Sequence, residues 1–330
     1  MPRWIFLLEC KEGRVVSLKI VLKSLFSILA TMLIVSAFVF FAEEMSIGDS
    51  ASYILSDEAS EKDIEEYRKQ NGLDDNIAIR YFNFLLSFFS LEWGSDVSGH
   101  SIISVIAERL PVTLSLSFFS ILMSLSISFV WVLFSVLKRG SFADLSLSVI
   151  SIILLSIPSF LIAIGLSLFF GLFLRWFPVA GYIAPEYSIT GFFKTLFLPS
   201  SALALVNLPL FMRMFRQSLL SNLDKIYTLS FKAQGANRLD LILHSALKPS
   251  LPLIFSLVVQ SISTSISGSA VIENVFALPG LGALLVKSVL SRDARLAGTI
   301  LMVVSFFISI LALLANMLSL IVDPRLREER

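Results

Sequence analysis

Charged residues, cysteine and histidine are all scarce in this 330-residue sequence. Only 15% of the residues are Asp, Glu, Lys or Arg, whereas 56% are hydrophobic, and the mean hydropathy is +0.84. Water therefore cannot be the solvent for most of the surface, and a lipid bilayer is the natural alternative. The formal net charge of +1 gives no reason to expect a nucleic acid as a partner.

The single cysteine, Cys10, excludes an internal disulfide, and together with the two histidines, His100 and His244, it offers no cluster with metal-ligand spacing. The sequence also lacks the motifs G-x-x-x-x-G-K-[ST], H-E-x-x-H and G-x-S-x-G. We therefore expect no catalytic site, no metal and no cofactor on this chain. The first twenty residues mix charged and apolar side chains, and no small-residue cleavage pattern closes the apolar run that follows, so no removable signal peptide is expected.

Six uncharged runs are long enough to cross a bilayer core of about 30 Å at about 1.5 Å per residue. They are Ser24–Ala42, Val112–Leu137, Leu145–Leu174, Thr195–Met212, Pro249–Ile272 and Leu296–Val322. Runs well above about 20 residues must tilt, break or line a cavity. The expected places are Pro158, Pro199, Pro209 and Pro252. The sequence thus predicts an all-α membrane protein with six transmembrane helices.

The charges between the runs predict the topology, since basic residues are retained in the cytoplasm. The segment Glu43 to Gly99 carries thirteen acidic residues against four basic ones, which places it outside. The basic loops after the second and fourth runs, and both termini, then lie inside. Lys287, Arg292 and Arg295 fit poorly, because this topology places them outside.

The predicted organisation follows this topology. It comprises a cytoplasmic extension (1–20), a first span (21–42), an extracytoplasmic loop domain (43–105), a core with the other five spans (106–322) and a cytoplasmic tail (323–330). The core includes a cytoplasmic loop at 213–248. Charge spacing in 57–70, followed by Gly72, predicts a short surface helix that caps the outer mouth.

The loop after the fourth run has an unusual pattern for a plain connector. Asp224–Gln234 predicts a short helix, Gly235 breaks it, and Arg238–Leu247 predicts a second helix. A unit of helix, glycine and helix at this place indicates a docking element.

Glu273 closes the fifth run, and an acid at the edge of a membrane helix is costly enough to be a functional candidate. It either contacts substrate or a moving partner helix, or it pairs with a basic residue such as Arg109 to fix the outer mouth. Asn274, the next residue, joins it as a candidate for the pathway.

Pro158 interrupts the thirty-residue third run. It frees a backbone carbonyl that Ser156 or a neighbouring helix can satisfy. Ser156 and Pro158 are therefore candidates for a hinge that lines the pathway, and a purely structural bend is the alternative.

A series of short motifs, in this order, resembles the permease subunits of oligopeptide, dipeptide and nickel ATP-binding-cassette importers, in particular the first permease of each pair. Ile47–Ser50 stands where that family has a Pro-Gly-Asp-Pro-like turn. The other motifs are Asn71–Asp74, Leu91–Ser95, Glu108–Leu114, Ser156–Phe160, Trp176–Gly181, Glu273–Gly282 and Asp323–Arg327.

The coupling signature of that family falls on Leu229 to Pro252. Here Lys232-Ala233-Gln234-Gly235 is similar to Arg-Ala-Lys-Gly, and Ala246-Leu247-Lys248 to Ala-Leu-Arg. Phe231, Ser245 and Pro249 depart from a small residue, a histidine and an asparagine. The resemblance implies that an ATPase is contacted by Lys232, Ala233, Gln234, Gly235, Arg238 and Asp240.

The resemblance implies a type I importer permease in the bacterial inner membrane, which forms half of a peptide pathway by alternating access. The implied partners are a sister permease, two ATPase subunits that bind ATP and Mg²⁺, and an extracytoplasmic substrate-binding protein. Nickel or another small solute remains open as the substrate. A different class, an ion-coupled secondary transporter, lacks support because the six runs contain no ionisable residue. A mere scaffold would leave the helix, glycine, helix loop unexplained.

Overall fold

The computed structural model describes residues 7–10, 14–54, 76–233 and 235–322. The chain divides into two compact units. The first unit comprises Met1–Leu25, Leu114–Leu278 and Ile310–Arg330, and the second comprises Phe26–Thr113 and Pro279–Ser309. The predicted surface helix at 57–70 lies outside the described residues.

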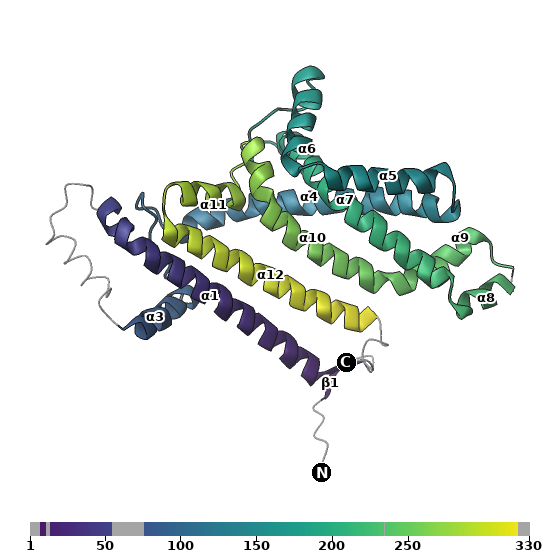
Figure 1. Ribbon diagram of the computed structural model, residues 1–330, viewed down its shortest axis with the longest axis horizontal. Coiled ribbons are helices and arrows are strands. Elements are labelled where there is room, and N and C mark those ends of the chain that lie inside the picture. Colours follow the sequence, from purple (N-terminus) through teal and green to yellow (C-terminus); the bar gives the residue numbers. More distant parts are fainter. Residues whose placement is uncertain (1–6, 11–13, 55–75, 234, 323–330) are drawn as a thin grey trace, which may run out of the picture. The chain divides into compact units, whose positions relative to one another are not determined.

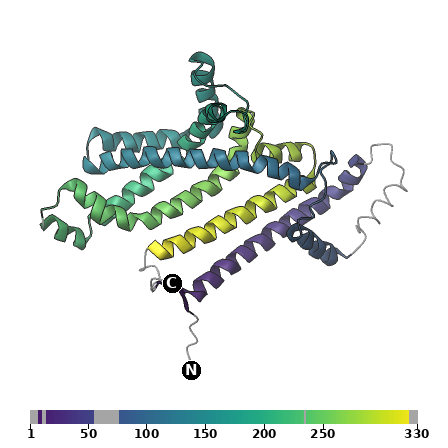
Figure 2. The same cartoon turned by 180° about the vertical axis from the view of Figure 1, so that it is seen from behind.

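The described residues form one strand pair and a series of helices (Figures 1 and 2). In chain order the elements are β1 (Leu7–Cys10), β2 (Arg14–Ser17), α1 (Leu18–Ile54), α3 (Ile77–Phe89), α4 (Ile102–Leu137), α5 (Phe142–Ser156), α6 (Ser159–Leu166), the π-helical η1 (Ser167–Phe173), α7 (Ile189–Leu223), α8 (Ile226–Ala233), α9 (Arg238–Asp240), the π-helical η2 (Leu241–Leu247), α10 (Lys248–Val275), α11 (Leu281–Leu290) and α12 (Ala294–Val322).

The predicted helical membrane class is confirmed. Five described helices are long and apolar enough to cross a bilayer, and a sixth crossing is present if the bent pair of α5 with α6 and η1 counts as one span. Every predicted run lies within one of these helices or the bent pair. The antiparallel hairpin of β1 and β2, which pairs Leu7 with Ser17 and Cys10 with Arg14, was not predicted.

Pro158 breaks the third span outright. The helix axes before and after it differ by 102°. Ile157 has an extended backbone (φ −93°, ψ 123°), because the residue before a proline is kept out of the helical region. The extra length of this run is therefore taken up by a corner rather than by tilt.

The directions of the helices in the first unit favour a broken span over a re-entrant loop. Helices α4 and α7 run parallel, since the Ser124 hydroxyl donates to the Ala204 carbonyl (2.7 Å) and Arg216 further along α7 reaches Ser135 further along α4 (3.2 Å). The chain between the end of α4 and the start of α7 must then pass from one end of the unit to the other. The bent pair and its connector make this passage.

Of the three outcomes expected at Pro199, Pro209 and Pro252, which were tilt, a break or a cavity lining, the structure excludes a break. Helix α7 continues through the first two prolines and α10 through the third. Both helices are held on their flanks by tight packing, and all three prolines are buried. Neighbouring helices can support a proline-containing span in this way, whereas Pro158 is exposed and has no such enclosure.

A polar seam joins α7 to α10. Asn222 Nδ2 donates to the Ser250 hydroxyl (3.0 Å), and Asn207 Nδ2 donates to the Ser265 hydroxyl (2.9 Å). The two pairs are fifteen residues apart on each helix and in opposite order, so the helices are antiparallel with a constant register. Small serine side chains allow this close approach and also serve as hydrogen-bond partners.

The second unit packs α1, α3, α11 and α12 with the first turns of α4. The Thr113 hydroxyl accepts the backbone N–H of Leu281 (2.8 Å) and so caps the start of α11. Asp293 accepts the N–H groups of Val97 and Leu296, which fixes the loop before α4 to the start of α12. Two of the family-like motifs, 108–114 and 273–282, thus meet at Thr113.

Ile47–Ser50, which stands where the family pattern has a turn, lies within α1, which continues as a helix to Ile54. The two prolines of that pattern are Ile47 and Ser50 here, and neither residue breaks a helix. Arg295, which fits the predicted topology poorly, forms an ion pair with Glu43 (3.4 Å), so a nearby acid offsets its charge.

Close packing of α1 on α12 depends on Gly298. A methyl group at this position would lie 2.5 Å from Cγ1 of Val39, and a β-branched side chain cannot turn away easily. Gly298→Ala is expected to destabilise the fold by about 1–3 kcal/mol, seen as a lower melting temperature in detergent.

Two variants check the cause of that loss. Val39→Ala combined with Gly298→Ala removes the clashing methyl group and should recover part of the melting temperature. Gly268→Ala is the matched control, since no atom lies within 4 Å of the added methyl group on α10. An equal loss in the two glycine variants would contradict the packing argument.

Candidate functional site

The glycine at the end of α8 has a specific backbone role. Gly235 has φ +84°, and the Ala236 N–H donates to the Phe231 carbonyl (3.2 Å). This is the helix ending in which a left-handed residue lets the next N–H reach back over the last turn. No heavy atom lies within 4 Å of a side chain built at Gly235, so conformation rather than space demands glycine.

Helix α8 is anchored to the core of the first unit at its other end. The buried Thr228 hydroxyl donates to the Asn222 carbonyl (3.0 Å). Asn222 in turn is fixed to Ser250 on α10 through its side chain. A displacement of α8 would therefore be passed to both α7 and α10.

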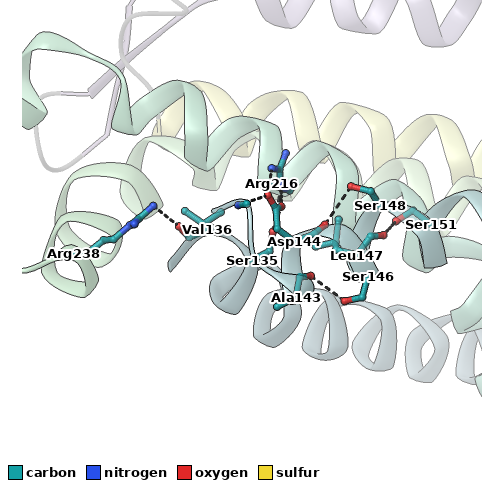
Figure 3. A network of polar contacts seen from close by, with 11 residues as sticks. Ser135, Val136, Ala143, Asp144, Ser146, Leu147, Ser148, Ser151, Arg216 and Arg238 are labelled. Atoms are coloured by element: carbon teal, nitrogen blue, oxygen red, sulfur yellow. Dashed lines mark hydrogen bonds and ion pairs between the residues drawn. The ribbon is translucent and has the colours of Figure 1, made fainter. Parts of the chain in front are cut away.

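Helix α9 is anchored to α4. Asn237 caps it by accepting the Asp240 N–H (2.9 Å), and Arg238 Nη2 donates to the Val136 carbonyl (3.1 Å), as Figure 3 shows. Val136 lies in the last turn of α4, where carbonyl groups lack a partner within the helix and attract a cation. Arg238 therefore closes the end of α4 with a charge-assisted hydrogen bond.

Next to this contact, Asp144 and Arg216 form an ion pair with two parallel hydrogen bonds (Figure 3). Arg216 Nε lies 2.7 Å from Asp144 Oδ1 and Nη2 lies 3.0 Å from Oδ2. Ser135 donates to the same carboxylate (2.6 Å) and also accepts from Arg216. The network joins α4, α5 and α7 at the end of the unit that carries α8 and α9.

The predicted docking unit is thus present as secondary structure. Helix α8 lies inside the predicted 224–234, and α9 with η2 covers the predicted 238–247. Of the residues proposed for coupling, Ala233 and Gly235 are exposed at the end of α8, and Arg238 and Asp240 follow on α9. Lys232 belongs to α8 by its backbone, and Gln234 lies outside the described residues.

The departures from the family pattern are accommodated locally. Phe231 is exposed and meets no crowding, whereas the buried Ser245 donates to the Leu241 carbonyl of its own helix. Pro249 follows the π-helical η2. A proline in a helix clashes with the carbonyl four residues earlier, and the wider turn relieves that clash.

The second group of candidates lies at the far end of α10. Glu273 has no exposed surface, and its carbonyl accepts the Leu278 N–H (2.8 Å) where the helix ends. The Phe276 carbonyl accepts the Gly181 N–H (2.9 Å), which ties the motif 176–181 to this end of α10. Asn274 is exposed and donates to the Ala270 carbonyl of its own helix (2.7 Å).

Ser156 and Pro158 are exposed at the corner between α5 and α6. Pro158 has no backbone N–H, so the Leu154 carbonyl loses its helical donor. The Ser156 hydroxyl does not replace that donor, because it donates to the Ile152 carbonyl instead (2.9 Å). Arg109 is half-buried and belongs to the second unit, whereas Glu273 belongs to the first. Their pairing stays a prediction.

Sequence reasoning missed the Asp144–Arg216 pair. The two are 72 residues apart, and no motif joins them. Within the described parts of the chain, no group of three or more His, Cys, Asp or Glu residues is placed to hold a metal ion.

The chain is similar to known transport proteins over most of its length. Residues 120–328 match the family described as binding-protein-dependent transport system inner membrane component. A Brucella abortus protein named as a peptide transport system permease is 31% identical over 93% of this chain and 98% of its own length. A peptide ABC transporter permease of Sinorhizobium fredii is 28% identical over 93% of this chain. A metal-staphylopine import system permease of Staphylococcus aureus is 28% identical over 94%.

Proposed function

The chain belongs to the family of binding-protein-dependent transport system inner membrane components, and from this premise we propose that it forms half of the peptide pathway of an ATP-binding-cassette importer. Its similarity to peptide permeases from two genera supports a peptide substrate. The partners that we propose are a sister permease, two ATPase subunits and an extracytoplasmic substrate-binding protein. The ATPase subunits bind ATP and Mg²⁺ and carry out the hydrolysis, so the chain itself is neither an enzyme nor a holder of a cofactor.

The observation that carries this proposal is the way in which the segment from α8 to α9 is held. Figure 1 shows α8 and α9 together at one end of the α7 and α10 pair. Thr228 ties α8 to Asn222 of α7, whose side chain bonds to α10, and Arg238 ties α9 to α4. A short helix held in this way can pass the closing motion of an ATPase pair to several spans at once, as a rigid-body rotation.

In this proposal Ala233, Gly235, Arg238 and Asp240, with Lys232 and Gln234, form the contact with the ATPase. Ala233 allows close approach, and Gly235 sets the direction in which the chain leaves α8. Arg238 acts as a positioning residue, because its bond to Val136 holds α9 on α4.

We place the α8 and α9 end in the cytoplasm. The exposed Lys138, Arg139 and Arg213 and the basic Lys225 and Arg238 lie at this end of the first unit, and basic residues mark the cytoplasmic side. An even number of spans then puts both termini in the cytoplasm and residues 43–105 outside.

The pathway candidates are proposed to act at the opposite end. Glu273 and Asn274 lie where α10 ends, and Ser156 and Pro158 form the corner of the broken span. Arg109 is the proposed counter-ion of Glu273 at the outer mouth. An ionisable residue buried at the edge of a span, as Glu273 is, is costly and is therefore a functional candidate.

A metal complex is the second candidate substrate, because the Staphylococcus aureus relative is named for metal-staphylopine import and matches the chain along nearly its whole length. Competition decides between the two substrates. Uptake of a labelled oligopeptide should be reduced by unlabelled peptides and unaffected by nickel chelates if the peptide assignment is correct.

Co-purification tests the proposed role directly. A tagged chain expressed with its neighbouring genes should purify with a second permease and two ATPase subunits in fixed ratio. In proteoliposomes this complex should take up solute only when ATP and the binding protein are both present. Uptake by the purified chain alone, or uptake driven by an ion gradient without ATP, would sink the proposal.

A further inference from the structure

An apolar groove runs along the outside of the first unit, between the second half of α4 and the start of α5. It has a volume of about 680 Å³ and is lined by Ile127, Val130, Trp131 and Phe134 on α4 and by Phe142 and Ala143 on α5. Figures 1 and 2 show the two helices side by side, joined by the turn at 138–141. None of its lining residues is among those proposed for the coupling contact or for the pathway.

The depth of this groove suits one leaflet of a bilayer. Its lining on α4 runs from Ser126 to Phe134, and Phe142 of α5 continues it beside the turn. At about 1.5 Å per residue the α4 part is about 12 Å long, which lies within half of the roughly 30 Å apolar core of a membrane. An acyl chain that enters from the surface at the turn would fill this length.

The open end of the groove carries positive charge. Lys138 and Arg139 are adjacent and exposed in the turn. Neither side chain forms a hydrogen bond or ion pair with any other residue that the structure describes. Phe142, 84% exposed, lies beside them at the mouth. Basic and aromatic side chains at the end of a span lie at the level of the lipid headgroups.

We propose that this groove binds an anionic phospholipid, with one acyl chain between α4 and α5 and the phosphate group at Lys138 and Arg139. The charge at the mouth favours a lipid over a helix of another subunit. An apolar helix in the groove would leave Lys138 and Arg139 without counter-ions. A basic residue near an anionic membrane surface gains about 1 kcal/mol, or about five-fold in binding, which predicts selectivity by headgroup.

The bound lipid has a structural consequence. The turn that holds the headgroup follows directly on Val136, whose carbonyl accepts the bond from Arg238, and precedes Asp144 of the ion-pair network. Gly140 in this turn also donates its N–H to Asp144 (3.0 Å). A lipid fixed at the turn therefore steadies the end of the unit to which α9 is attached.

Trp131 reports on the groove directly. The full-length chain, with the subunits that purify with it, is placed in phosphatidylcholine vesicles that contain equal mole fractions of either brominated phosphatidylcholine or brominated phosphatidylglycerol. The fluorescence of Trp131 is obtained as the difference between the native chain and Trp131→Phe. Quenching of this difference should be at least about five-fold more effective with brominated phosphatidylglycerol.

Charge variants separate headgroup recognition from simple contact with lipid. In Lys138→Gln/Arg139→Gln the preference for phosphatidylglycerol should fall to near equality, while quenching by both lipids persists. Lys194→Gln, an exposed lysine near the start of α7, should keep the preference. Equal quenching by both lipids in the native chain, or a preference that survives the double variant, overturns the proposal. Absence of quenching by either lipid also overturns it, because a protein surface then covers the groove.

Discussion

Replacing Gly235 by proline is expected to abolish ATP-driven uptake while the chain still inserts into the membrane at its normal level. Gly235 has φ +84°, and a proline ring fixes φ near −65°, so the chain can no longer leave α8 in its native direction. The bond from Ala236 to Phe231 that closes the helix is lost as well. Nothing packs against Gly235, so the spans keep their structure.

Substitutions of Gly235 that differ in how well they tolerate a left-handed backbone give a graded test of the docking role. Asparagine adopts this conformation more readily than alanine, which costs about 1–2 kcal/mol there. Uptake should therefore be highest in Gly235→Asn, lower in Gly235→Ala and lowest in Gly235→Pro. Gly99→Ala is the matched control, because Gly99 also has positive φ (+83°) and open space around it.

Gly99→Ala is expected to leave uptake near the native value, since this loop belongs to the second unit and carries no coupling role. The membrane level of each variant is measured by immunoblotting, and uptake is measured in cells that express the partner subunits. Normal uptake by Gly235→Pro would remove the docking role from this segment.

Ala233→Arg tests the same surface without a change in backbone. Ala233 is exposed, so an arginine there meets no atom of its own chain that must move. It does prevent close approach of a second protein. Loss of uptake together with loss of the co-purified ATPase is the expected result.

The helices could be predicted because their signals are local. A run without charge that is bounded by charged residues fixes a span from its own composition, and all six runs lie within helices or the bent pair. The end of α8 is equally local, since glycine is the residue that most readily takes the left-handed conformation at the end of a helix. A resemblance of motifs says less about local structure, because Ile47–Ser50 stands where the family has a turn and yet lies within α1.

Contacts between distant segments could not be predicted in the same way. The run with Pro158 and the run with Pro199 and Pro209 look alike in sequence, yet only the first is broken. What differs is enclosure by neighbouring helices, which is a property of the folded chain. The bond from Arg238 to Val136 joins residues 102 positions apart, and no periodicity signals it.

The Asp144–Arg216 pair should respond strongly to loss of one partner. The side chains keep only 12% and 24% of their surface exposed, so a single replacement leaves a charge in a poorly solvated place. Such a loss costs about 3 kcal/mol, the low end of the range for buried pairs, because Arg216 retains some contact with solvent. Asp144→Leu alone and Arg216→Met alone should each lower the melting temperature in detergent by about 5 °C or more.

Removal of the whole polar group should be far less damaging than removal of one half. In Asp144→Leu/Ser135→Ala/Arg216→Met no charge and no hydroxyl remains without a partner, and apolar replacements of similar volume are often neutral. The triple variant is therefore expected to melt within a few degrees of the native chain.

Arg213→Met is the control for loss of charge alone. Arg213 is an exposed arginine one turn earlier on α7, and its replacement should change the melting temperature little. If the triple variant is as unstable as the single variants, the loss of stability does not come from an unpaired charge, and the pair itself stabilises the unit. If the single variants melt like the native chain, α4, α5 and α7 are not joined through this pair at all.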